Sequence, residues 1–349
     1  MNTNQPIVSR RSLLAASAAG LLSTALPSTA QPNSPQPYSP QPTSPRTRLL
    51  RFAHITDTHI TPNRSSAKAV EQMLAHINAL PDAPQFILHT GDVIMDAMAA
   101  TRDKTAEQWA LWKQATAANK LPIEYTLGNH DIWGWNFLAA GATGKESDYG
   151  KKWACNELGL TSPYRTFDRS GFRFILLDSI SPYLTGGYIA KIDADQFHWL
   201  EQTLAATPAD MPVIIASHVP ILSVAVYNWS NSDKPTTQPT TQPQNVGRLF
   251  VRDRGDVVLQ GNLVHSDWRR LKTLFAKHKN IKAALSGHLH LVDRCDSNGI
   301  AYMCNGAASA GWWSGPHMDE CDFGYALLDL YSDGTIDRQY LTYGWTAPK

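Results

Sequence analysis

The sequence predicts an α/β fold in which two mixed β-sheets pack against each other and helices flank them. Strand-like apolar stretches alternate with amphipathic helical stretches through most of the chain, which is typical of α/β domains. Three further strand-like stretches then follow one another near the C-terminal end, which suits two packed mixed sheets. With 349 residues, 43% of them hydrophobic, and no visible repeat, residues 47–349 can form one large domain.

The predicted strands are short apolar runs that end at polar or small residues. They cover residues 51–56, 85–89, 121–127, 172–178, 211–217, 281–285, 300–304, 325–330 and 335–341. A hairpin is expected at residues 169–171, before the fourth of these strands. The predicted helices cover residues 65–80, 101–120, 193–206 and 265–278. The first helix is expected to be capped and to bury Ala69, Met73, Leu74 and Ile77.

Five short polar blocks stand in order along the chain, each at or just after the end of a predicted strand. The blocks are Asp57-Thr58-His59, Gly91-Asp92, Gly128-Asn129-His130-Asp131, Ser217-His218 and Gly287-His288-Leu289-His290. Because open α/β sheets bind ligands at the carboxyl edge of their strands, these groups are expected to gather there. Alternate side chains of an extended segment share a face, which would let Asp57 and His59 bind one ion together. The set offers enough carboxylate, imidazole and amide ligands for two metal ions that share one carboxylate.

The blocks resemble the pattern D-x-H, G-D, G-N-H-[D/E], H and G-H-x-H of the calcineurin-like metallophosphoesterase family. The resemblance runs from Asp57 to His290 and implies a four-layer α/β/β/α sandwich with a dinuclear metal centre. The first ion would be held by Asp57, His59, Asp92 and His290. The second would be held by Asp92, Asn129, His218 and His288. Asp92 would therefore bridge the two ions.

The same resemblance implies the catalytic groups and the reaction. His130 matches the catalytic histidine, which contacts the substrate phosphate, and Asp131 matches the carboxylate that orients it. Two cations about 3.5–4 Å apart can turn a bridging water into the hydroxide nucleophile of phosphoester hydrolysis. His130 would stabilise negative charge or protonate the leaving group, and the sequence leaves both roles open. Mixed ligands of this kind suit divalent or trivalent ions, and Mn, Fe, Zn and Ni all remain open.

The resemblance narrows the substrate to small-molecule phosphoesters, with diesters favoured over monoesters. His59, and the lack of a Tyr after Gly91-Asp92, disfavour the purple acid phosphatase branch. Three alternatives remain. The first is a phosphomonoesterase, the second is a phosphoprotein (Ser/Thr) phosphatase, and the third is a non-catalytic metal-binding relative.

The N-terminal residues are expected to direct export. Residues 9–14, Ser-Arg-Arg-Ser-Leu-Leu, resemble a twin-arginine signal, and an apolar run follows up to a small-residue end at Ala30. A general secretory signal stays open because Leu13 and Ala15 depart from the fuller twin-arginine pattern. Residues 1–30 are thus a predicted signal peptide, 31–46 a Pro/Ser/Gln-rich linker, and the protein is expected in the periplasm or outside the cell.

Composition bears on the expected partners. Without residues 1–30, which hold two Arg and no acid, 29 basic and 30 acidic residues remain, so the formal charge is −1. This disfavours nucleic acid as a dedicated partner. The apolar run near the N-terminus is too short for a stable membrane span. The sequence gives no oligomeric state.

Several further features stay open at the level of sequence. Residues 219–264 form a predicted insertion, either a flap at the mouth of the site or a surface loop. The four cysteines permit disulfides without fixing their pairing, and free thiols are the alternative; they are Cys155, Cys295, Cys304 and Cys321. His54 and His89 are expected to be hydrogen-bonded core residues. Trp312 and Trp313 either line the site or pack in the core.

Overall fold

The computed structural model describes the domain that carries the five polar blocks. The described residues are 46–183, 186–230, 250–251, 257–258 and 261–347. The predicted signal peptide, the linker apart from its last residue and more than half of the predicted insertion lie outside them. Among the described helices, none is both long and apolar enough to span a bilayer.

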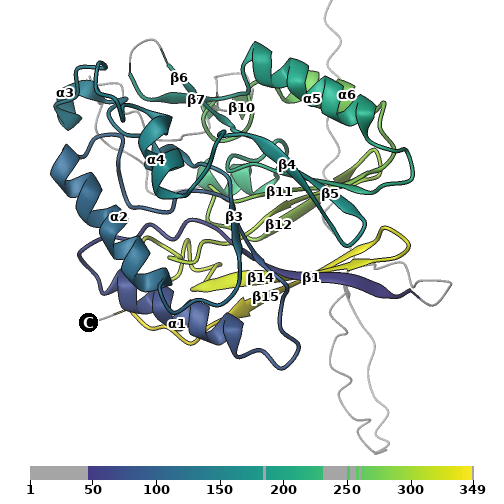
Figure 1. The fold of residues 1–349 in the computed structure, drawn as a ribbon, viewed down its shortest axis with the longest axis horizontal. Helices are drawn as coiled ribbons and strands as arrows, with labels where there is room; N and C mark the ends of the chain where they lie inside the picture. The colour runs from purple at the N-terminus through teal and green to yellow at the C-terminus, as the bar shows by residue number, and fades with distance from the viewer. Residues whose placement is uncertain (1–45, 184–185, 231–249, 252–256, 259–260, 348–349) are drawn as a thin grey trace, which may run out of the picture. The chain divides into compact units, whose positions relative to one another are not determined.

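The first sheet joins the two ends of the domain. Its strand order is β15-β14-β1-β2-β3. The strands are β1 (Arg48–Ile55), β2 (Ile87–His89), β3 (Ile123–Tyr125), β14 (Gly324–Tyr331) and β15 (Ile336–Thr342). β1, β2 and β3 are parallel, whereas β14 pairs antiparallel with β1. Figure 1 shows the purple β1 beside the yellow β14 and β15.

The second sheet has the strand order β12-β13-β11-β8-β5-β4. The strands are β4 (Arg165–Arg169), β5 (Phe172–Leu176), β8 (Val213–Ala216), β11 (Ile281–Ser286), β12 (Asp293–Ser297) and β13 (Ile300–Cys304). The four central strands are parallel, and β4 and β12 join them as antiparallel edges. The predicted hairpin at residues 169–171 is confirmed by the pairing of β4 with β5.

The two sheets pack face to face through one apolar core. Phe52 of β1, Phe86 before β2 and Phe174 of β5 meet there, with the Phe52 and Phe86 ring centroids 5.0 Å apart. Helices α1 (Ser66–Asn78) and α2 (Arg102–Thr116) cover the outer face of the first sheet. Helices α5 (Ala194–Ala206) and α6 (Trp268–Phe275) cover the outer face of the second (Figure 1). The predicted fold class, two packed mixed sheets flanked by helices, is confirmed.

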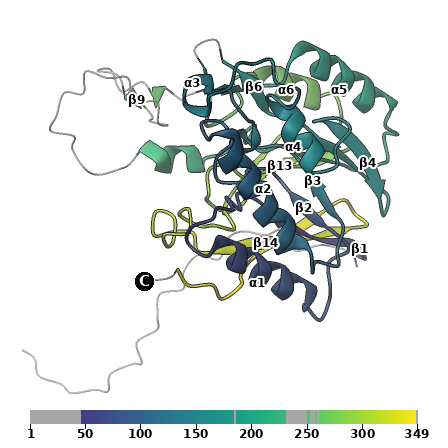
Figure 2. The ribbon, with the colours of Figure 1, turned by 60° about the vertical axis from the view of Figure 1, so that its left-hand side comes forward.

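Short elements surround this sandwich and include two small sheets. They are α3 (Phe137–Ala140), α4 (Lys151–Glu157), the 3-10 turns Asn129–Asp131 and Ala225–Ser230, β6 (Ile180–Pro182), β7 (Tyr188–Ala190), β9 (Phe250–Val251) and β10 (Val257–Val258). Figure 2 shows α3 and β6 beyond the end of α2.

The structure differs from the sequence expectations in the cap of α1 and in the length of α6, and it decides the state of the cysteines. Ser65 does not cap α1 through its side chain; it has a φ of 54°, and the neighbouring Ser66 hydroxyl bonds the backbone of Thr61 instead. The predicted helix 265–278 is shorter, because α6 covers only Trp268–Phe275. All four cysteines are free thiols, so the disulfides that the sequence permitted are absent.

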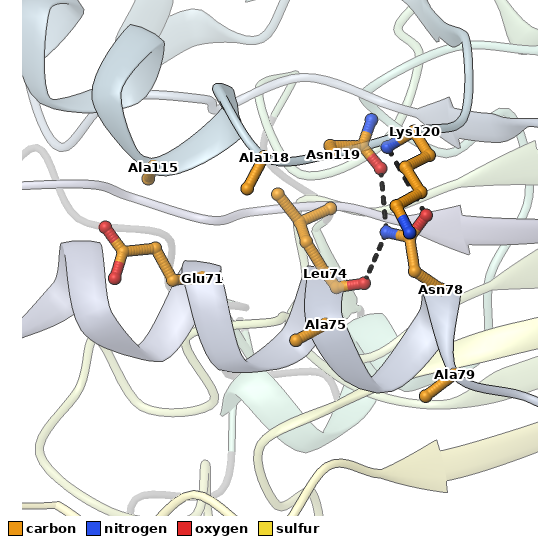
Figure 3. A pocket seen from close by; sticks show the side chains of 9 residues that line it. All are labelled: Glu71, Leu74, Ala75, Asn78, Ala79, Ala115, Ala118, Asn119 and Lys120. Carbon is orange, nitrogen blue, oxygen red and sulfur yellow. Dashed lines mark hydrogen bonds between the residues drawn. The ribbon is translucent and has the colours of Figure 1, made fainter.

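An open cavity of about 460 Å³ lies between α1 and the end of α2 (Figure 3). Its floor is made of small and apolar side chains such as Leu74 and Ala115. Asn78 Nδ2 donates to the Leu74 carbonyl and to Asn119 Oδ1 at one end of it. None of the residues of the five polar blocks lines this cavity.

Candidate metal centre

The five polar blocks meet at the carboxyl ends of the strands of both sheets. The blocks at Asp57, Asp92 and Asn129 follow β1, β2 and β3 of the first sheet. The blocks at His218 and His288 follow β8 and β11 of the second sheet. The structure therefore brings together side chains that are up to 233 residues apart in the chain.

These side chains converge through sharp turns rather than through an extended backbone. Five residues of the blocks have a left-handed backbone although none is glycine: Asp57 (φ 54°), His59 (φ 41°), Asp92 (φ 54°), His288 (φ 71°) and His290 (φ 57°). The prediction that Asp57 and His59 share a face of an extended strand was wrong, because β1 ends at Ile55. Such conformations cost of the order of 1–3 kcal/mol each and are concentrated at functional sites.

The first cluster is formed by Asp57, His59 and His290. Asp57 Oδ1 lies 3.3 Å from His290 Nε2 and 3.7 Å from His59 Nε2. The Nε2 atoms of the two histidines are 3.0 Å apart. Asp92 Oδ2 lies 3.7 Å from His59 Nε2, so Asp92 borders this cluster as well.

The second cluster is formed around His218. Its Nε2 lies 3.2 Å from Asp92 Oδ2, 3.1 Å from Asn129 Oδ1 and 3.1 Å from His288 Nδ1. Asp92 thus lies between the two clusters, where a bridging carboxylate was expected. His288 and His290, which are two residues apart, belong to different clusters.

Backbone carbonyls fix which nitrogen of three histidines faces the clusters. His218 Nδ1 donates to Thr90 O at 2.8 Å, His290 Nδ1 donates to Ala310 O at 2.7 Å, and His288 Nε2 donates to Asn262 O at 2.8 Å. In the neutral imidazole only one nitrogen carries a proton, so the other nitrogen of each ring presents a lone pair to its cluster. Facing lone pairs repel each other unless a cation or a proton lies between them.

The remaining polar atoms of the clusters also fit metal ions. Asp57 Oδ1, which lies beside both histidines of the first cluster, is buried and has no hydrogen-bond partner among the described residues. Burial raises the pKa of the Asp57 and Asp92 carboxyls, but the neighbouring histidines outweigh it and lower both below the usual range. Two ionised carboxylates are therefore buried at the centre, where nearby cations would offset the cost of burying their charge.

The imidazoles respond to this environment in two ways. Burial lowers the pKa of His59 to about 4 and that of His288 to about 3, which leaves both neutral and able to bind a metal. Burial also lowers the pKa of His218, but the Asp92 and Asp57 charges outweigh it and raise this pKa to about 9. The donor set of carboxylate, imidazole and amide groups suits two ions that share Asp92.

His130 lies beside the clusters and is less buried than the other block histidines except His288. Its ring packs edge-on against that of His59, with centroids 4.7 Å apart, and its Nδ1 donates to the Met95 carbonyl. Its backbone N–H donates to Asp92 Oδ1 at 2.8 Å. His130 also groups with His59 and Asp92 as a third set of possible ligand atoms, which lie within 4.8 Å of one another.

The expectation that Asp131 orients His130 was wrong. The Asp131 carboxylate accepts backbone N–H groups of Gly128 (2.8 Å), Asp92 (3.0 Å), Val93 (2.8 Å) and Ile94 (3.3 Å). It thereby holds together the two loops that carry Asp92 and His130. The orientation of His130 comes instead from the carbonyl of Met95, which no sequence pattern singled out.

Glycines let the loops approach the carboxylates closely. A Cβ on Gly287 would lie 1.9 Å from Thr56 Oγ1 and 2.3 Å from Asp57 Oδ2. A Cβ on Gly128 would lie 2.1 Å from Asp92 Oδ1. Gly91 has a φ of 91° and approaches Gly128. The close contacts are with ligand carboxylates rather than with an ion.

Residues outside the blocks complete the walls of the site. Asn262 belongs to the predicted insertion, and its carbonyl holds His288, so the end of the insertion does reach the site. The ring of Tyr188 lies edge-on to His288 with centroids 6.2 Å apart. Neither could be found from sequence, because each depends on a contact between distant segments without a recognisable motif.

The other aromatic and histidine residues divide between core and site. His54 and His89 are buried and hydrogen-bonded to Thr90 Oγ1 (2.8 Å) and Thr58 Oγ1 (3.0 Å), as predicted. Trp313 packs in the core, and its Nε1 donates to the His59 carbonyl at 3.0 Å. Trp312 instead lies against His290, with ring centroids 4.5 Å apart. Of the two alternatives left open by the sequence, packing in the core holds for Trp313 and a place beside the site holds for Trp312.

Comparisons with known proteins agree with this architecture. A family model described as calcineurin-like phosphoesterase matches residues 50–292. The 3',5'-cyclic adenosine monophosphate phosphodiesterase CpdA of Escherichia coli (strain K12) is 22% identical over 83% of this chain and 88% of its own. A probable glycerophosphodiester phosphodiesterase GpdQ of Arcobacter nitrofigilis is 24% identical over 68% of this chain and 71% of its own. The solved structure of a dimetal phosphatase from Danio rerio shares the fold, with a TM-score of 0.54, 14% identity, and coverage of 85% of this chain and 100% of that one.

Proposed function

The chain belongs to the calcineurin-like phosphoesterase family, and from this premise we propose that it hydrolyses small-molecule phosphodiesters at the two clusters. One observation carries the proposal. Ring nitrogens of four histidines and two buried, ionised carboxylates converge on two adjacent points, with Asp92 between them. The two relatives reported above are both named as phosphodiesterases, which supports diesters over monoesters.

We assign the ligands as the geometry groups them. Asp57, His59, Asp92 and His290 would hold one ion. Asp92, Asn129, His218 and His288 would hold the other. When bound, two such ions supply the positive charge that binds phosphoryl oxygens and makes water acidic enough to act as a nucleophile at neutral pH. Mn, Fe, Zn and Ni all suit this ligand set.

The chain itself orients the ligand imidazoles and supplies His130 as a proton-bearing group. The carbonyls of Thr90, Ala310 and Asn262 hold three ligand imidazoles in fixed tautomers, so little reorganisation is needed when the ions bind. The carbonyl of Met95 holds His130 Nδ1–H, which leaves Nε2 for the substrate. With a second proton on Nε2, His130 would donate a hydrogen bond to a phosphoryl oxygen or that proton to the leaving oxygen, which typically contributes 10²–10⁴-fold.

The N-terminal sequence supports a proposal for where this reaction takes place. Residues 1–30 would act as an export signal and residues 31–46 as a tether, so the enzyme would work in the periplasm or outside the cell. There it would meet extracellular phosphodiesters rather than an internal messenger. Fractionation of cells that express the full chain, with and without the Arg10 and Arg11 pair, tests this: a chain that stays inside in both cases contradicts export.

The activity is tested by hydrolysis of bis(p-nitrophenyl) phosphate and p-nitrophenyl phosphate after chelation and refilling with Mn or Zn. We expect metal-restored cleavage with the diester faster. His130→Ala should keep both ions and lose about 10²–10⁴-fold in turnover. His198→Ala, an exposed histidine on α5, is the matched control and should leave turnover unchanged. No cleavage of either compound by metal-loaded protein would favour the non-catalytic alternative, and loss of metal from His130→Ala would make His130 a ligand.

A further inference from the structure

The loop that follows β13, residues 305–310, holds ligands of the first ion site through its backbone and one hydroxyl. The Ser309 hydroxyl donates to the Asp57 carbonyl at 2.7 Å, and the Ser309 N–H donates to the same carbonyl at 3.3 Å. The Ala310 carbonyl accepts the His290 Nδ1–H at 2.7 Å. The position of this loop therefore determines where two of the ligands stand, although none of its residues belongs to the five polar blocks.

Asn305 anchors the start of this loop. It is fully buried and directly follows the last residue of β13. Its backbone N–H donates to the carbonyl of Ser286 at 2.9 Å, and Ser286 immediately precedes Gly287 of the last polar block. Its side chain bonds Arg338 of β15 and His54 of β1, which both belong to the first sheet, whereas β13 belongs to the second. Asn305 is therefore a point at which both sheets and the loop meet.

Arg338 decides which way the Asn305 amide points. A guanidinium group has only donors, so Arg338 Nη1 must donate to Asn305 Oδ1, which lies 3.1 Å away. The amide Nδ2 then faces His54 Nδ1 and donates to it. Arg338 Nη1 is itself held by the backbone carbonyls of Asp293 at 2.7 Å and Cys304 at 2.9 Å. The direction of the Asn305 side chain is thus fixed by a cation that is bound to the backbone.

The same direction continues through His54 to a ligand of the second ion site. Burial lowers the pKa of His54 to about 3, so its ring is neutral and carries one proton. Because Nδ1 accepts from Asn305, this proton is on Nε2 and is donated to Thr90 Oγ1 at 2.8 Å. The Thr90 carbonyl in turn accepts the His218 Nδ1–H at 2.8 Å. A chain of buried contacts therefore joins Asn305 to the ligand His218.

We propose that Asn305 is a positioning residue for both ion sites. Its backbone starts the loop that holds Asp57 and His290 of the first site. Its side chain supports, through His54, the residue whose carbonyl holds His218 of the second site. The proposal rests on the ligands assigned under the proposed function. Groups that orient metal ligands typically contribute about 10–100-fold to metal affinity or activity, and Asn305 acts through such groups, so we expect an effect of about tenfold.

The experiment measures the Mn affinities of the full chain by competition with a chelator, together with its melting temperature. Asn305→Ala should weaken the binding of both ions by about tenfold. Asn305→Asp should restore most of this loss, because a carboxylate accepts from Arg338 and also from a His54 ring that carries its proton on Nδ1.

Asn280→Ala is the matched control. Asn280 is also buried, and its Nδ2 donates to the backbone carbonyls of Pro208 at 3.1 Å and Met211 at 2.9 Å. It precedes β11, at the opposite end of that strand from Gly287. The control should lower the melting temperature and leave both Mn affinities unchanged, so it separates loss of stability from loss of ligand positioning.

Two further variants separate the two routes from Asn305 to the ions. Ser309→Ala removes a bond to the backbone of the first site and should weaken that ion alone, by about tenfold. His54→Leu breaks the side-chain route and should weaken the second ion alone. His290→Ala and Asn129→Ala each remove a proposed ligand of one site, and they show which ion each step of the chelator titration belongs to.

The outcomes separate this proposal from the proposed function. Unchanged Mn affinities in Asn305→Ala would overturn the proposal, even with a lower melting temperature, and so would a loss in Asn305→Asp as large as in Asn305→Ala. Where Asn305→Ala does not fold, Ser309→Ala and His54→Leu decide, and wild-type affinities in both would overturn it. A wild type that binds two Mn ions but does not hydrolyse bis(p-nitrophenyl) phosphate would reject the proposed function and leave the positioning role intact. A wild type that binds no Mn would reject both.

Discussion

Replacement of Gly287 by Ala should remove the first metal ion without touching any ligand atom. The added Cβ would lie 2.3 Å from Asp57 Oδ2 and 1.9 Å from Thr56 Oγ1, and both distances are far below van der Waals contact. Gly287 starts the block that leads to His288, and its N–H bonds the His218 carbonyl at 3.0 Å, so the backbone is held on this side too. The Asp57 carboxylate must therefore move.

The size of the effect follows from the bonds that Asp57 makes. Asp57 Oδ2 accepts the Thr56 hydroxyl at 2.6 Å and the His288 N–H at 2.9 Å. Hydrogen bonds to charged groups are worth about 1.5–3 kcal/mol each. We expect a loss of about 3–6 kcal/mol in the free energy of unfolding if both bonds break. Loss of orientation around a metal ligand typically weakens metal binding by about 10–100-fold.

The assay measures metal content after gel filtration, metal affinity by competition with a chelator, and unfolding in urea. Gly261→Ala is the control, because its Cβ would meet Ile189 at 3.5 Å, an ordinary contact, although Gly261 adjoins Asn262 of the same site. The control should keep two ions. A Gly287→Ala protein that binds two ions with wild-type affinity would refute the inferred packing of this loop against Asp57.

Three further outcomes are expected. Asp92→Ala should empty both metal positions, because both clusters border this carboxylate, and two fully occupied ions measured by mass spectrometry would reject the bridge. Asp131→Ala should lower the free energy of unfolding in urea by about 3 kcal/mol or more, since four backbone N–H groups lose their buried acceptor, and a change below 1 kcal/mol would contradict that role. Burial lowers the pKa of His54 to about 3, so the unfolded chain takes up its proton first and stability falls as the pH drops from about 6.5 towards 3. His54→Gln should reduce this slope by about 1.4 kcal/mol per pH unit, and an unchanged slope would show that His54 is not buried as a neutral ring.

Much of the fold could be predicted because its signals are local. The runs that became β1, β5 and β11 are mostly apolar, since most of their residues are buried, and such runs are visible without knowledge of their neighbours. The ends of elements were less well predicted. Ser65 resembled a cap, but the Ser66 hydroxyl bonds the backbone of Thr61, a choice that depends on the path of the preceding loop.

The residues that make up the candidate site were predictable, whereas the hydrogen bonds that hold them in place were not. Asp57, Asp92 and His218 stand in short motifs whose residue types already indicate metal chemistry. Asp131 stands in such a motif too, yet its carboxylate binds loop backbone, because four N–H groups converge on it only after the loops fold. The backbone carbonyls of Met95, Ala310 and Asn262 hold site histidines, but a sequence cannot single them out because every residue has a backbone carbonyl.

The two clusters lie across the junction of the two sheets, and each draws ligands from both. Asp57, His59, Asp92 and Asn129 belong to the first sheet, and His218, His288 and His290 belong to the second. Neither sheet alone can assemble a complete ion site, so an intermediate with one folded sheet would hold neither ion tightly. Bound ions would therefore add links between the two sheets and stabilise their packing against each other.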